Sequence, residues 1–512
     1  MPINSQASET LTPVVFRSPK RRRSRTGAWL GLLLLAGAFS WARAATWYVA
    51  TTGSDGNPGS SAQPWLTLQK AADAAQPGDT VIVRAGTYAG FRSKRGGSSG
   101  LPITFQAETG ATVTVSGPGP QSWHGSVICL EGDEDAAHGW WVIDGFEVTG
   151  ATSSAGIDIR GYDTRPITNV TIRRCHCHHN QKWGIFTSFA DDFTAEDNEC
   201  DHSAVEHGIY HSNSGDRAVI RRNVAHDNNA GGIQINADPS MGGDGISSAC
   251  EVSFNVAYGN GAAGGAAINL ASVRNSLICN NLLYNNRAGG IALWDDGQGN
   301  EWGCKSNRIL FNTVHMPSNG RWALNMINGS TGNTVRNNLL IHDGSRGGLE
   351  TDAASIAGLV SDYNVQHQVS YDDTILSLAQ WQAQRSQDLH SQDHGAAATF
   401  VDPASDHHLP AAAWARNHGL CETGVTTDLD GTARPQEGTC DIGCYEYTTA
   451  GPLRGDIDEN GVVNAADVSL LAAWLAAKPI AYTVTLPKAD LNDDGRIDIL
   501  DLVALLRTAT GA

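Results

Sequence analysis

The stretch NVAHDN (Asn223–Asn228) decides the fold of this chain, because copies of it recur along the middle of the sequence. The first residues of successive copies lie 23 to 32 positions apart, and a short strand-like run that begins with Gly or Ala follows most of them. The copies are CHCHHN (Cys175–Asn180), NECDHS (Asn198–Ser203), NVAYGN (Asn255–Asn260), NLLYNN (Asn281–Asn286), NTVHMP (Asn312–Pro317) and NLLIHD (Asn338–Asp343). Irregular repeats of this length, with short strands and no helical periodicity, indicate a solenoid whose coils stack to bury their apolar sides.

Two columns of the aligned copies indicate how the coils stack. The first column begins with Cys175 and is Asn in every later copy. Asn tolerates the left-handed backbone of a tight corner, and its amide can bond to the same amide one coil away, at a strand spacing of ~4.8 Å. The third column is small or apolar and is expected to point inward: Cys177, Cys200, Ala225, Ala257, Leu283, Val314 and Leu340. This pattern resembles the right-handed parallel β-helix, which implies an all-β solenoid.

The N-terminal segment predicts export. Lys20–Arg25 is a basic region, Ala28–Phe39 is apolar, and Ala42-Arg43-Ala44 fits a cleavage site, so residues 1–44 are expected to be a signal peptide. The apolar run is too short for a membrane span, although an uncleaved anchor is an alternative. We expect a secreted protein, extracellular or on the cell surface. The net charge of −18 argues against nucleic acid and anionic membranes as partners, and a polyanionic glycan would need a bridging cation.

All ten cysteines follow the predicted signal, where disulfides are permitted. Cys177 and Cys200 share the inward column on adjacent coils, so we expect them to be bonded to each other. One further pair is expected among Cys421, Cys440 and Cys444. The alternative for each is a buried free thiol.

Two twelve-residue segments near the C-terminus have the pattern of calcium-binding loops, with oxygen-bearing side chains at positions 1, 3, 5, 9 and 12, Gly at position 6 and a backbone carbonyl at position 7. The predicted ligands are Asp456, Asp458, Asn460, Val462, Asn464 and Asp467 in the first loop, and Asp490, Asn492, Asp494, Arg496, Asp498 and Asp501 in the second. An apolar helix is expected after each loop. The duplicated unit resembles a dockerin domain, which implies two Ca²⁺ ions and a cohesin-bearing partner.

The same resemblance implies that partner choice depends on positions 10 and 11 of each loop. Here these are Ala465-Ala466 and Ile499-Leu500, which differ from the Ser-Thr pair of the cellulosomal type I pattern.

The expected organisation follows from these segments. Residues 45–345 form the β-helix with an N-terminal capping region, and residues 346–447 form its C-terminal end. A linker (448–454) and the dockerin module (455–512) follow. The capping region, with a predicted helix at Leu66–Ala75, resembles secreted β-helix proteins that include the family-nine pectate lyases. The run DLDGTARP…CDIGCYEY (Asp428–Tyr447) resembles the terminal segment of bacterial surface β-helix proteins.

A candidate site lies where the Gly-led strands present polar and aromatic side chains outward, next to long loops at 238–249 and 295–307. The predicted catalytic residues are Tyr210, His211, Asp216 and Asp238, and the predicted substrate-binding residues are Arg160, Gln234, Asn236 and Trp294. Tyr210 or His211 would be the base of a β-elimination, whereas Asp216 and Asp238 would hydrolyse a glycosidic bond. Alternatively, His211 is a core histidine, because it aligns with inward residues such as Ile235.

Two further features bear on this site. An outward ladder favours external stacking over a metal site: His178, Asp201, His226, Tyr258, Tyr284 and His315. The family-nine lyase pattern is also not matched, because His211-Ser212 stands in place of its catalytic Lys and Ala230–Gln234 in place of its Asp-rich calcium motif. The sequence therefore predicts a polysaccharide-active protein of the O-glycosyl hydrolase or lyase type. A non-catalytic glycan-binding or surface protein is the alternative, and a purely structural spacer is a third.

Overall fold

The computed structural model describes residues 44–122, 124–132, 138–448, 454–458, 463–476, 484–492 and 496–510. The predicted signal peptide therefore lies outside the described residues, apart from Ala44. Within the described part of the chain, no helix is both long enough and apolar enough to cross a membrane.

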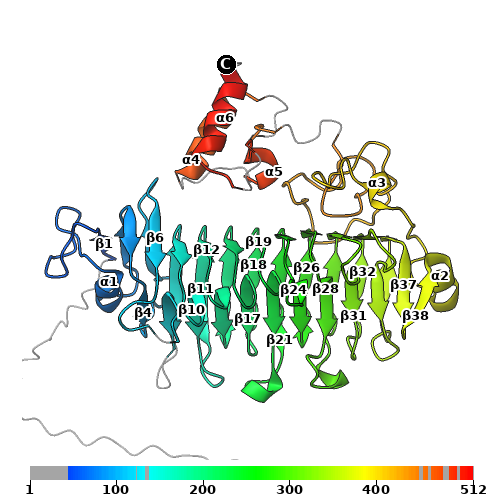
Figure 1. Ribbon diagram of the computed structural model, residues 1–512, viewed down its shortest axis with the longest axis horizontal. Coiled ribbons are helices and arrows are strands. Elements are labelled where there is room, and N and C mark those ends of the chain that lie inside the picture. The colour runs from blue at the N-terminus through cyan, green and yellow to red at the C-terminus, as the bar shows by residue number, and fades with distance from the viewer. Residues whose placement is uncertain are drawn as a thin grey trace, which may run out of the picture. The chain divides into compact units, whose positions relative to one another are not determined.

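Three parallel sheets, here called A, B and C, wind around one interior, and each coil contributes one strand to each sheet in that order (Figure 1). Sheet A contains β1 (Thr46–Val49), β2 (Thr80–Val83), β5 (Ile103–Ala107), β8 (Gly139–Asp144), β11 (Ile167–Arg173), β15 (Thr194–Glu196), β18 (Val219–Arg221), β22 (Glu251–Ser253), β26 (Leu277–Cys279), β29 (Arg308–Leu310), β32 (Thr334–Arg336) and β35 (Val360–Asp362), with β14 (Ala190–Asp191) beside β11.

Sheet B contains β3 (Gly86–Tyr88), β6 (Val113–Ser116), β9 (Glu147–Thr149), β12 (His176–His178), β16 (Glu199–Asp201), β19 (Val224–His226), β23 (Val256–Tyr258), β27 (Leu282–Tyr284), β30 (Thr313–Met316), β33 (Leu339–His342) and β36 (Val365–Gln366). Sheet C contains β4 (Phe91–Ser93), β7 (Ile128–Glu131), β10 (Ala155–Arg160), β13 (Trp183–Ser188), β17 (Ile209–Ser212), β20 (Ile233–Asn236), β24 (Ala266–Ala271), β28 (Gly289–Trp294), β31 (Leu324–Met326), β34 (Leu349–Thr351), β37 (Gln368–Tyr371) and β38 (Thr374–Ser377). A small pair, β21 (Ser247–Ser248) and β25 (Val273–Arg274), joins two loops. The predicted parallel β-helix is confirmed.

Side chains of the same kind stack in register through the interior. Sheet C contributes one fully buried ladder: Ile157, Ile185, Ile209, Ile233, Ile268, Ile291, Leu324 and Leu349. The small or apolar column predicted to point inward from sheet B is also buried throughout. Gly184 lies within β13 and Gly208 directly before β17, and at both positions there is no room for a side chain, because an added Cβ would lie 2.7 and 2.9 Å from the next coil's carbonyl oxygen.

The predicted Asn ladder forms at the corner between sheets A and B. Asn255, for example, accepts from the backbone N–H of Asn223 at 2.9 Å and donates through Nδ2 to Ile220 O and Asn281 Oδ1, at 2.9 and 3.0 Å. The expectation that Asn itself takes the left-handed backbone is wrong. The residue before each Asn has the positive φ, as at Arg222 (53°), because the Asn side chain must point inward to reach the next coil.

Two more Asn ladders, not predicted, stabilise the other corners. Between sheets B and C, Asn228 donates to Asn260 at 3.0 Å and Asn260 to Asn286 at 3.1 Å. Between sheets C and A, Asn307 donates to Asn333 at 3.1 Å.

The predicted Cys177–Cys200 disulfide is wrong. The two residues are neighbours in register on β12 and β16, but both are buried free thiols. Stacked residues of parallel strands project side chains in the same direction rather than towards each other, which does not suit disulfide geometry. The second expectation is confirmed, since Cys421 and Cys440 are bonded.

Both ends of the β-helix are covered. At the first end, α1 (Leu68–Ala74) begins after the N-cap Thr67 and buries Leu68, close to the predicted range. At the other end, β38 pairs antiparallel with β37 and leads into α2 (Leu378–Arg385), whose Trp381 is fully buried. These additions cover strand edges that would otherwise pair with another molecule.

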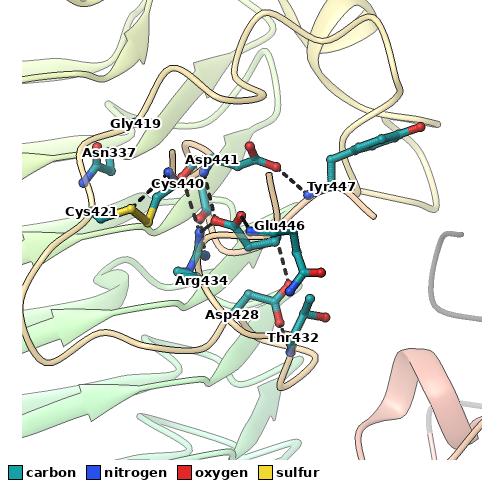
Figure 2. Close-up of polar contacts among 12 residues, drawn as sticks. Asn337, Gly419, Cys421, Asp428, Thr432, Arg434, Cys440, Asp441, Glu446 and Tyr447 are labelled. Atoms are coloured by element: carbon teal, nitrogen blue, oxygen red, sulfur yellow. Dashed lines mark hydrogen bonds and ion pairs between the residues drawn. A yellow bond between two sulfur atoms is a disulfide. The ribbon is translucent and has the colours of Figure 1, made fainter. Parts of the chain in front are cut away.

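The segment after α3 (Ala396–Thr399) folds back onto the corner between sheets A and B (Figure 1). Figure 2 shows its polar contacts around Arg434, whose Nη1 lies 2.6 Å from Glu446 Oε1 and whose Nη2 donates to Asn280 Oδ1 at 3.0 Å. Asp428 accepts from the backbone N–H groups of Thr432 and Glu446. The run Asp428–Tyr447 thus fastens this segment to the coils.

The C-terminal module contains α4 (Ala465–Leu475), the short α5 (Leu486–Ala489) and α6 (Ile499–Thr510). Its small core is built around Ile457, Leu471 and Leu505. The two predicted apolar helices are confirmed, but each begins earlier than expected, at position 10 of its loop.

Candidate functional site

An aromatic cluster lies on the outer face of sheet C, on β13 and β17. The rings of Trp183 and Phe186 stack with centroids 4.2 Å apart, and Tyr210 meets Phe186 edge-on at 5.3 Å. The indole N–H of Trp183 donates to Glu206 at 2.8 Å. Burial lowers the pKa of the neighbouring His207 to about 4, so that this ring is neutral at pH 7. Trp183 and Phe186 are only 8% and 6% exposed, so Tyr210 provides most of the accessible aromatic surface of the cluster, beside the carboxylate of Glu206.

Amides and carboxylates continue this face over the next coils. Asn269 donates to Gln234 at 2.6 Å, and Asn236 donates to Asp296 at 2.7 Å. Burial raises the pKa of Asp296, and the negative charge of Asp238 raises it further, although the hydrogen bond from Asn236 opposes both effects. Asp238 and Asp296 lie on different loops, at the ends of β20 and β28, and the charge of Asp238 acts on Asp296.

Trp294 closes this row. Its indole N–H is buried and has no hydrogen-bond partner among the described residues. A buried donor without a partner costs free energy unless a ligand satisfies it. The side chain is half-buried, so its ring also presents accessible surface.

The predicted catalytic residues do not form one group. Tyr210 faces outward within the aromatic cluster, and burial raises its pKa to about 12. His211 faces the interior, where it is fully buried between Thr187 Oγ1 at 2.7 Å and Gly215 O at 3.0 Å. Neighbouring residues of a strand point to opposite faces, so His211 is the core histidine of the alternative and cannot reach a substrate on the Tyr210 side.

The two predicted catalytic acids lie in different surroundings. Asp216 accepts from Ser248 N at 2.7 Å, and its pKa is raised mainly by burial and then by Asp191 and Asp244. Asp238 instead precedes the short helix η1 (Pro239–Met241) and adjoins Asp296. The charge of Asp238 acts on Asp296, an acid that was not predicted, whereas that of Asp191 acts on Asp216.

The predicted substrate-binding residues share the outer face of sheet C. Arg160 differs from the others because its side chain makes an ion pair within the protein. It is held by Asp158, with Nε 2.8 Å from Oδ1, and lies over the ring of Phe186 at 4.7 Å. Gln234 and Asn236 are only 5% and 8% exposed, so the accessible surface comes from their neighbours Tyr210 and Trp294.

Three residues of this face were missed by the sequence reasoning: Trp183, Glu206 and Asp296. Trp183 directly precedes Gly184, which the repeat predicts as the first residue of its strand. Asp296 lies in the loop 295–307 next to η2 (Asn300–Trp302), which was recognised as a loop without any residue being singled out. Its position two residues after the outward Trp294 was the available signal.

The first predicted calcium loop brings carboxylates together. Asp456, Asp458 and Asp467 each offer an oxygen, and these atoms lie within 4.8 Å of one another. Asp467 is fully buried; its Oδ1 accepts from Ile457 N at 2.7 Å and its Oδ2 from Asn464 N at 2.8 Å. Carboxylate oxygens gathered in this way suit Ca²⁺. Asn460 and Val462 lie outside the described residues.

The second loop repeats the hydrogen bonds to the aspartate at position 12. Asp501 is fully buried; its Oδ1 accepts from Leu491 N at 2.7 Å and its Oδ2 from Asp498 N at 2.8 Å. Asp494 lies outside the described residues. Asp490, Asn492 and Arg496 are described, and they stay predicted ligands.

The chain resembles known proteins in both parts. Residues 47–204 match the family model described as the Pel9A-like, right handed beta helix region, and residues 454–508 match the Dockerin type I domain. The crystal structure of pectate lyase Pel9A superposes with a TM-score of 0.56 at 17% identity, covering 79% of this chain and 96% of that one. A structure titled Glycoside hydrolase gives a TM-score of 0.47 at 11% identity, covering 64% and 94%.

A curated relative is similar over a short stretch. The uncharacterized protein YwoF of Bacillus subtilis (strain 168) is 41% identical over 71 residues, which are 14% of this chain and 15% of that protein. Dockerin type I domains bind calcium, in agreement with the carboxylates gathered in the first loop. The chain therefore combines a right-handed parallel β-helix, similar in fold to pectate lyase Pel9A, with a C-terminal dockerin type I domain.

Proposed function

We propose that the β-helix binds a polysaccharide along the outer face of sheet C and hydrolyses it, while the dockerin attaches the protein to a cohesin-bearing partner outside the cell. The observation that carries this proposal is the row of aromatic and amide side chains that ends at the acid pair Asp238 and Asp296.

The row has the chemistry that sugars require. Aromatic rings such as Tyr210 and Trp294 pack against the apolar faces of sugar rings, and their polar atoms orient the chain. The buried N–H of Trp294 would donate to a sugar hydroxyl. Because the strands are stacked at ~4.8 Å, successive coils would contact successive parts of one glycan chain.

The acid pair supports hydrolysis. In most glycosidases a carboxyl group that stays protonated donates a proton to the leaving oxygen, and a second, ionised carboxylate acts as base or nucleophile. The raised pKa of Asp296 suits the acid, and Asp238 is its partner carboxylate.

Elimination has less support. Tyr210, with a pKa raised to about 12, is a weak base at neutral pH, and His211 is enclosed in the core. Elimination also needs positive charge to neutralise a uronate carboxylate. Arg160 is already paired with Asp158, and Lys182 Nζ lies 3.9 Å from Glu206. We therefore propose a neutral glycan as substrate.

The dockerin presents apolar side chains for a partner. Ile499 and Leu500, at positions 10 and 11 of the second loop, are 62% and 56% exposed, and Ala465 and Ala466 are exposed in the first. Exposed apolar side chains of this kind mark protein–protein contacts. We propose that two Ca²⁺ ions hold these helix starts in place and that a cohesin binds them.

The test uses purified protein and a panel of neutral and acidic polysaccharides. Hydrolysis releases reducing ends without the absorbance at 235 nm that unsaturated elimination products give. Asp296→Asn and Asp238→Asn should each lower the rate by at least about 100-fold. Asp244→Asn, an exposed acid in the same loop as Asp238, is the matched control.

Two outcomes would replace this proposal. A rise at 235 nm that survives Asp296→Asn would favour elimination. Glycan binding without any product, abolished by Tyr210→Ala, would favour the non-catalytic alternative.

A further inference from the structure

A patch of histidines and carboxylates covers the outer face of sheet B on three successive coils, β12, β16 and β19. His176 lies beside Glu199 in register, and Asp201 lies between His178 and His226. The sequence favoured simple stacking along this ladder. Stacking is indeed found further along, where His226 and Tyr258 are parallel with centroids 4.7 Å apart and Tyr258 and Tyr284 follow at 5.1 Å. On the first three coils the side chains converge instead.

Ligand-type atoms of His176, Glu199 and Asp201 lie within 4.8 Å of one another, and His226 approaches two of these residues from the next coil. His176 Nε2 is 2.5 Å from Asp201 Oδ2 and 3.8 Å from Glu199 Oε2. From the next coil, His226 Nε2 is 3.1 Å from Glu199 Oε1 and 3.9 Å from Asp201 Oδ2. Four tetrahedral ligands bound to Zn²⁺ at 2.0–2.2 Å lie about 3.4 Å from one another. Of the four distances given above, 2.5 and 3.1 Å are shorter than that value, and 3.8 and 3.9 Å are longer.

The surroundings of His226 match those of a metal ligand. Its Nδ1 lies 2.9 Å from Asp227 Oδ2, and its ring is fixed by the stacked ring of Tyr258. A metal-bound histidine usually bonds through its second ring nitrogen to a carboxylate, which fixes the tautomer and leaves the first nitrogen as ligand. Here Asp227 occupies that outer position, and Nε2 faces the two acids.

The patch is built on rigid backbone and stays reachable. Exposed fractions are 6% for the side chain of Asp201, 13% for His226, 20% for Glu199 and 22% for His176. All four residues belong to ladder strands, so their Cα positions are set by backbone hydrogen bonds.

We propose that His176, Glu199, Asp201 and His226 bind one divalent transition-metal ion of the Zn²⁺ type, which joins three coils of the β-helix. Two imidazoles exclude a calcium site, because Ca²⁺ takes oxygen ligands, whereas mixed imidazole and carboxylate ligands suit Zn²⁺, Ni²⁺ or Cu²⁺. None of these four residues belongs to the dockerin loops or to sheet C.

The test is a titration of the full-length protein with ZnCl₂ in excess calcium, which saturates the dockerin, in competition with a fluorescent zinc indicator. We expect one zinc ion per chain. His176→Ala and His226→Ala should weaken binding by more than about 100-fold, and Asp227→Asn by about 10- to 100-fold. His367→Ala removes an exposed, acid-paired histidine elsewhere and should change binding by less than about twofold.

Co²⁺ in place of zinc gives a second readout, because its visible spectrum reports the coordination geometry directly. Thermal unfolding of each variant without zinc checks that it is folded. Absence of zinc binding in excess calcium would overturn the proposal. Binding that survives both single variants but is lost in His179→Ala/His202→Ala would also overturn it, because those exposed residues form a different group with Asp201.

Discussion

At the corners of the β-helix, buried polar atoms are satisfied by copies of one neutral group, whereas in the dockerin they are satisfied by carboxylates. Asn255 and its equivalents use both ends of the amide, to the coil before and the coil after. Asp467 and Asp501 instead accept backbone N–H groups of their own loops. A stack of amides carries no net charge and needs no ion. A group of acids repels itself, so its stability depends on a cation.

The largest effect should therefore be that of calcium removal. The module of about 60 residues has a small core, so metal binding and folding should be coupled. The isolated fragment Gly455–Ala512 should gain helical circular dichroism when calcium is added and lose it with a chelator.

The β-helix should melt almost unchanged under the same treatment, which makes it the internal control. A fragment that is equally helical with and without calcium would show that the carboxylates do not need the ion, and the contrast between the two parts would fail.

The next largest effect should come from breaking a buried ion pair of the β-helix, in which no metal ion takes part. The side chains of Arg434 and Glu446 are 0% and 1% exposed. Arg434→Met leaves the carboxylate unpaired and should lower the free energy of unfolding of the β-helix by about 3–5 kcal/mol in denaturant titrations.

The double variant Arg434→Met/Glu446→Gln should recover much of that loss, because the carboxylate that lost its partner is then replaced by a neutral amide. Arg416→Met breaks the exposed pair with Glu437 and should have no measurable effect. Equal losses in the single and double variants would contradict the argument from charge.

A titrating pair should have a smaller, pH-dependent effect. Burial alone would lower the pKa of His408, but its contacts with Asp406 at 2.6 Å and Asp430 at 2.9 Å outweigh burial and raise the pKa to about 10. The stabilisation is then complete below pH 6.5, the unfolded value, and is lost as pH rises towards 10. We expect a loss of roughly 2–4 kcal/mol over that range.

Unfolding midpoints measured from pH 6 to 10 should fall more steeply for the wild type than for His408→Gln. His390→Gln, at an exposed pair with Asp362, should leave the wild-type slope intact. Parallel curves for His408→Gln and wild type would show that this histidine is not charged in the fold.

The smallest effect should come from one rung of the neutral ladder. Asn255→Ala removes an acceptor and a donor and should cost roughly 1–3 kcal/mol, because the partners on both sides are left unsatisfied. Differential scanning calorimetry measures this change, with the exposed Asn319→Ala as control. A control that destabilises as much as Asn255→Ala would mean that the ladder amides contribute nothing special.

The repeat made much of the fold predictable. Once the copies were aligned, the inward column and the outward rows of sheet C followed, because residues in one column are neighbours one coil away. The alignment even placed His211 with inward residues such as Ile235, and the structure agrees. The alignment did not decide whether His211 is a catalytic residue or a core residue. The dockerin loops were predictable because all ligands of one ion lie within twelve residues.

Other contacts gave no local signal. Asp296 and Asp238 come from loops of different length, so no column aligns them. Asn280 and Arg434 are 154 residues apart, and only the folded chain brings them together. The Cys177–Cys200 error has a physical cause, since a strand spacing that suits a disulfide does not give the side-chain directions that it needs.

The left-handed residue that precedes each corner Asn has a further consequence. Its side chain does not take part in the amide ladder, so its identity can vary from coil to coil: Asp197, Arg222, Phe254, Asn280, Phe311, Asn337 and Tyr363, together with Arg174, which precedes Cys175 at the same corner. The early members are charged and pair with one another, as Arg222 does with Asp197. The later members receive the returning segment, since Arg434 contacts Asn280 and Phe311, and Leu420 bonds to Asn337.

The residues of this row are spaced one coil apart along the solenoid. The returning segment contacts one of these residues on each of three successive coils, at Asn280, Phe311 and Asn337. Its contacts therefore depend on the number of coils that it covers. Inserting or deleting a coil between Asn280 and Asn337 would change the distance between these two residues by a strand spacing of ~4.8 Å, and the segment could no longer reach both. The contacts of the returning segment thus limit the number of coils in this stretch, although each coil alone could stack on another coil.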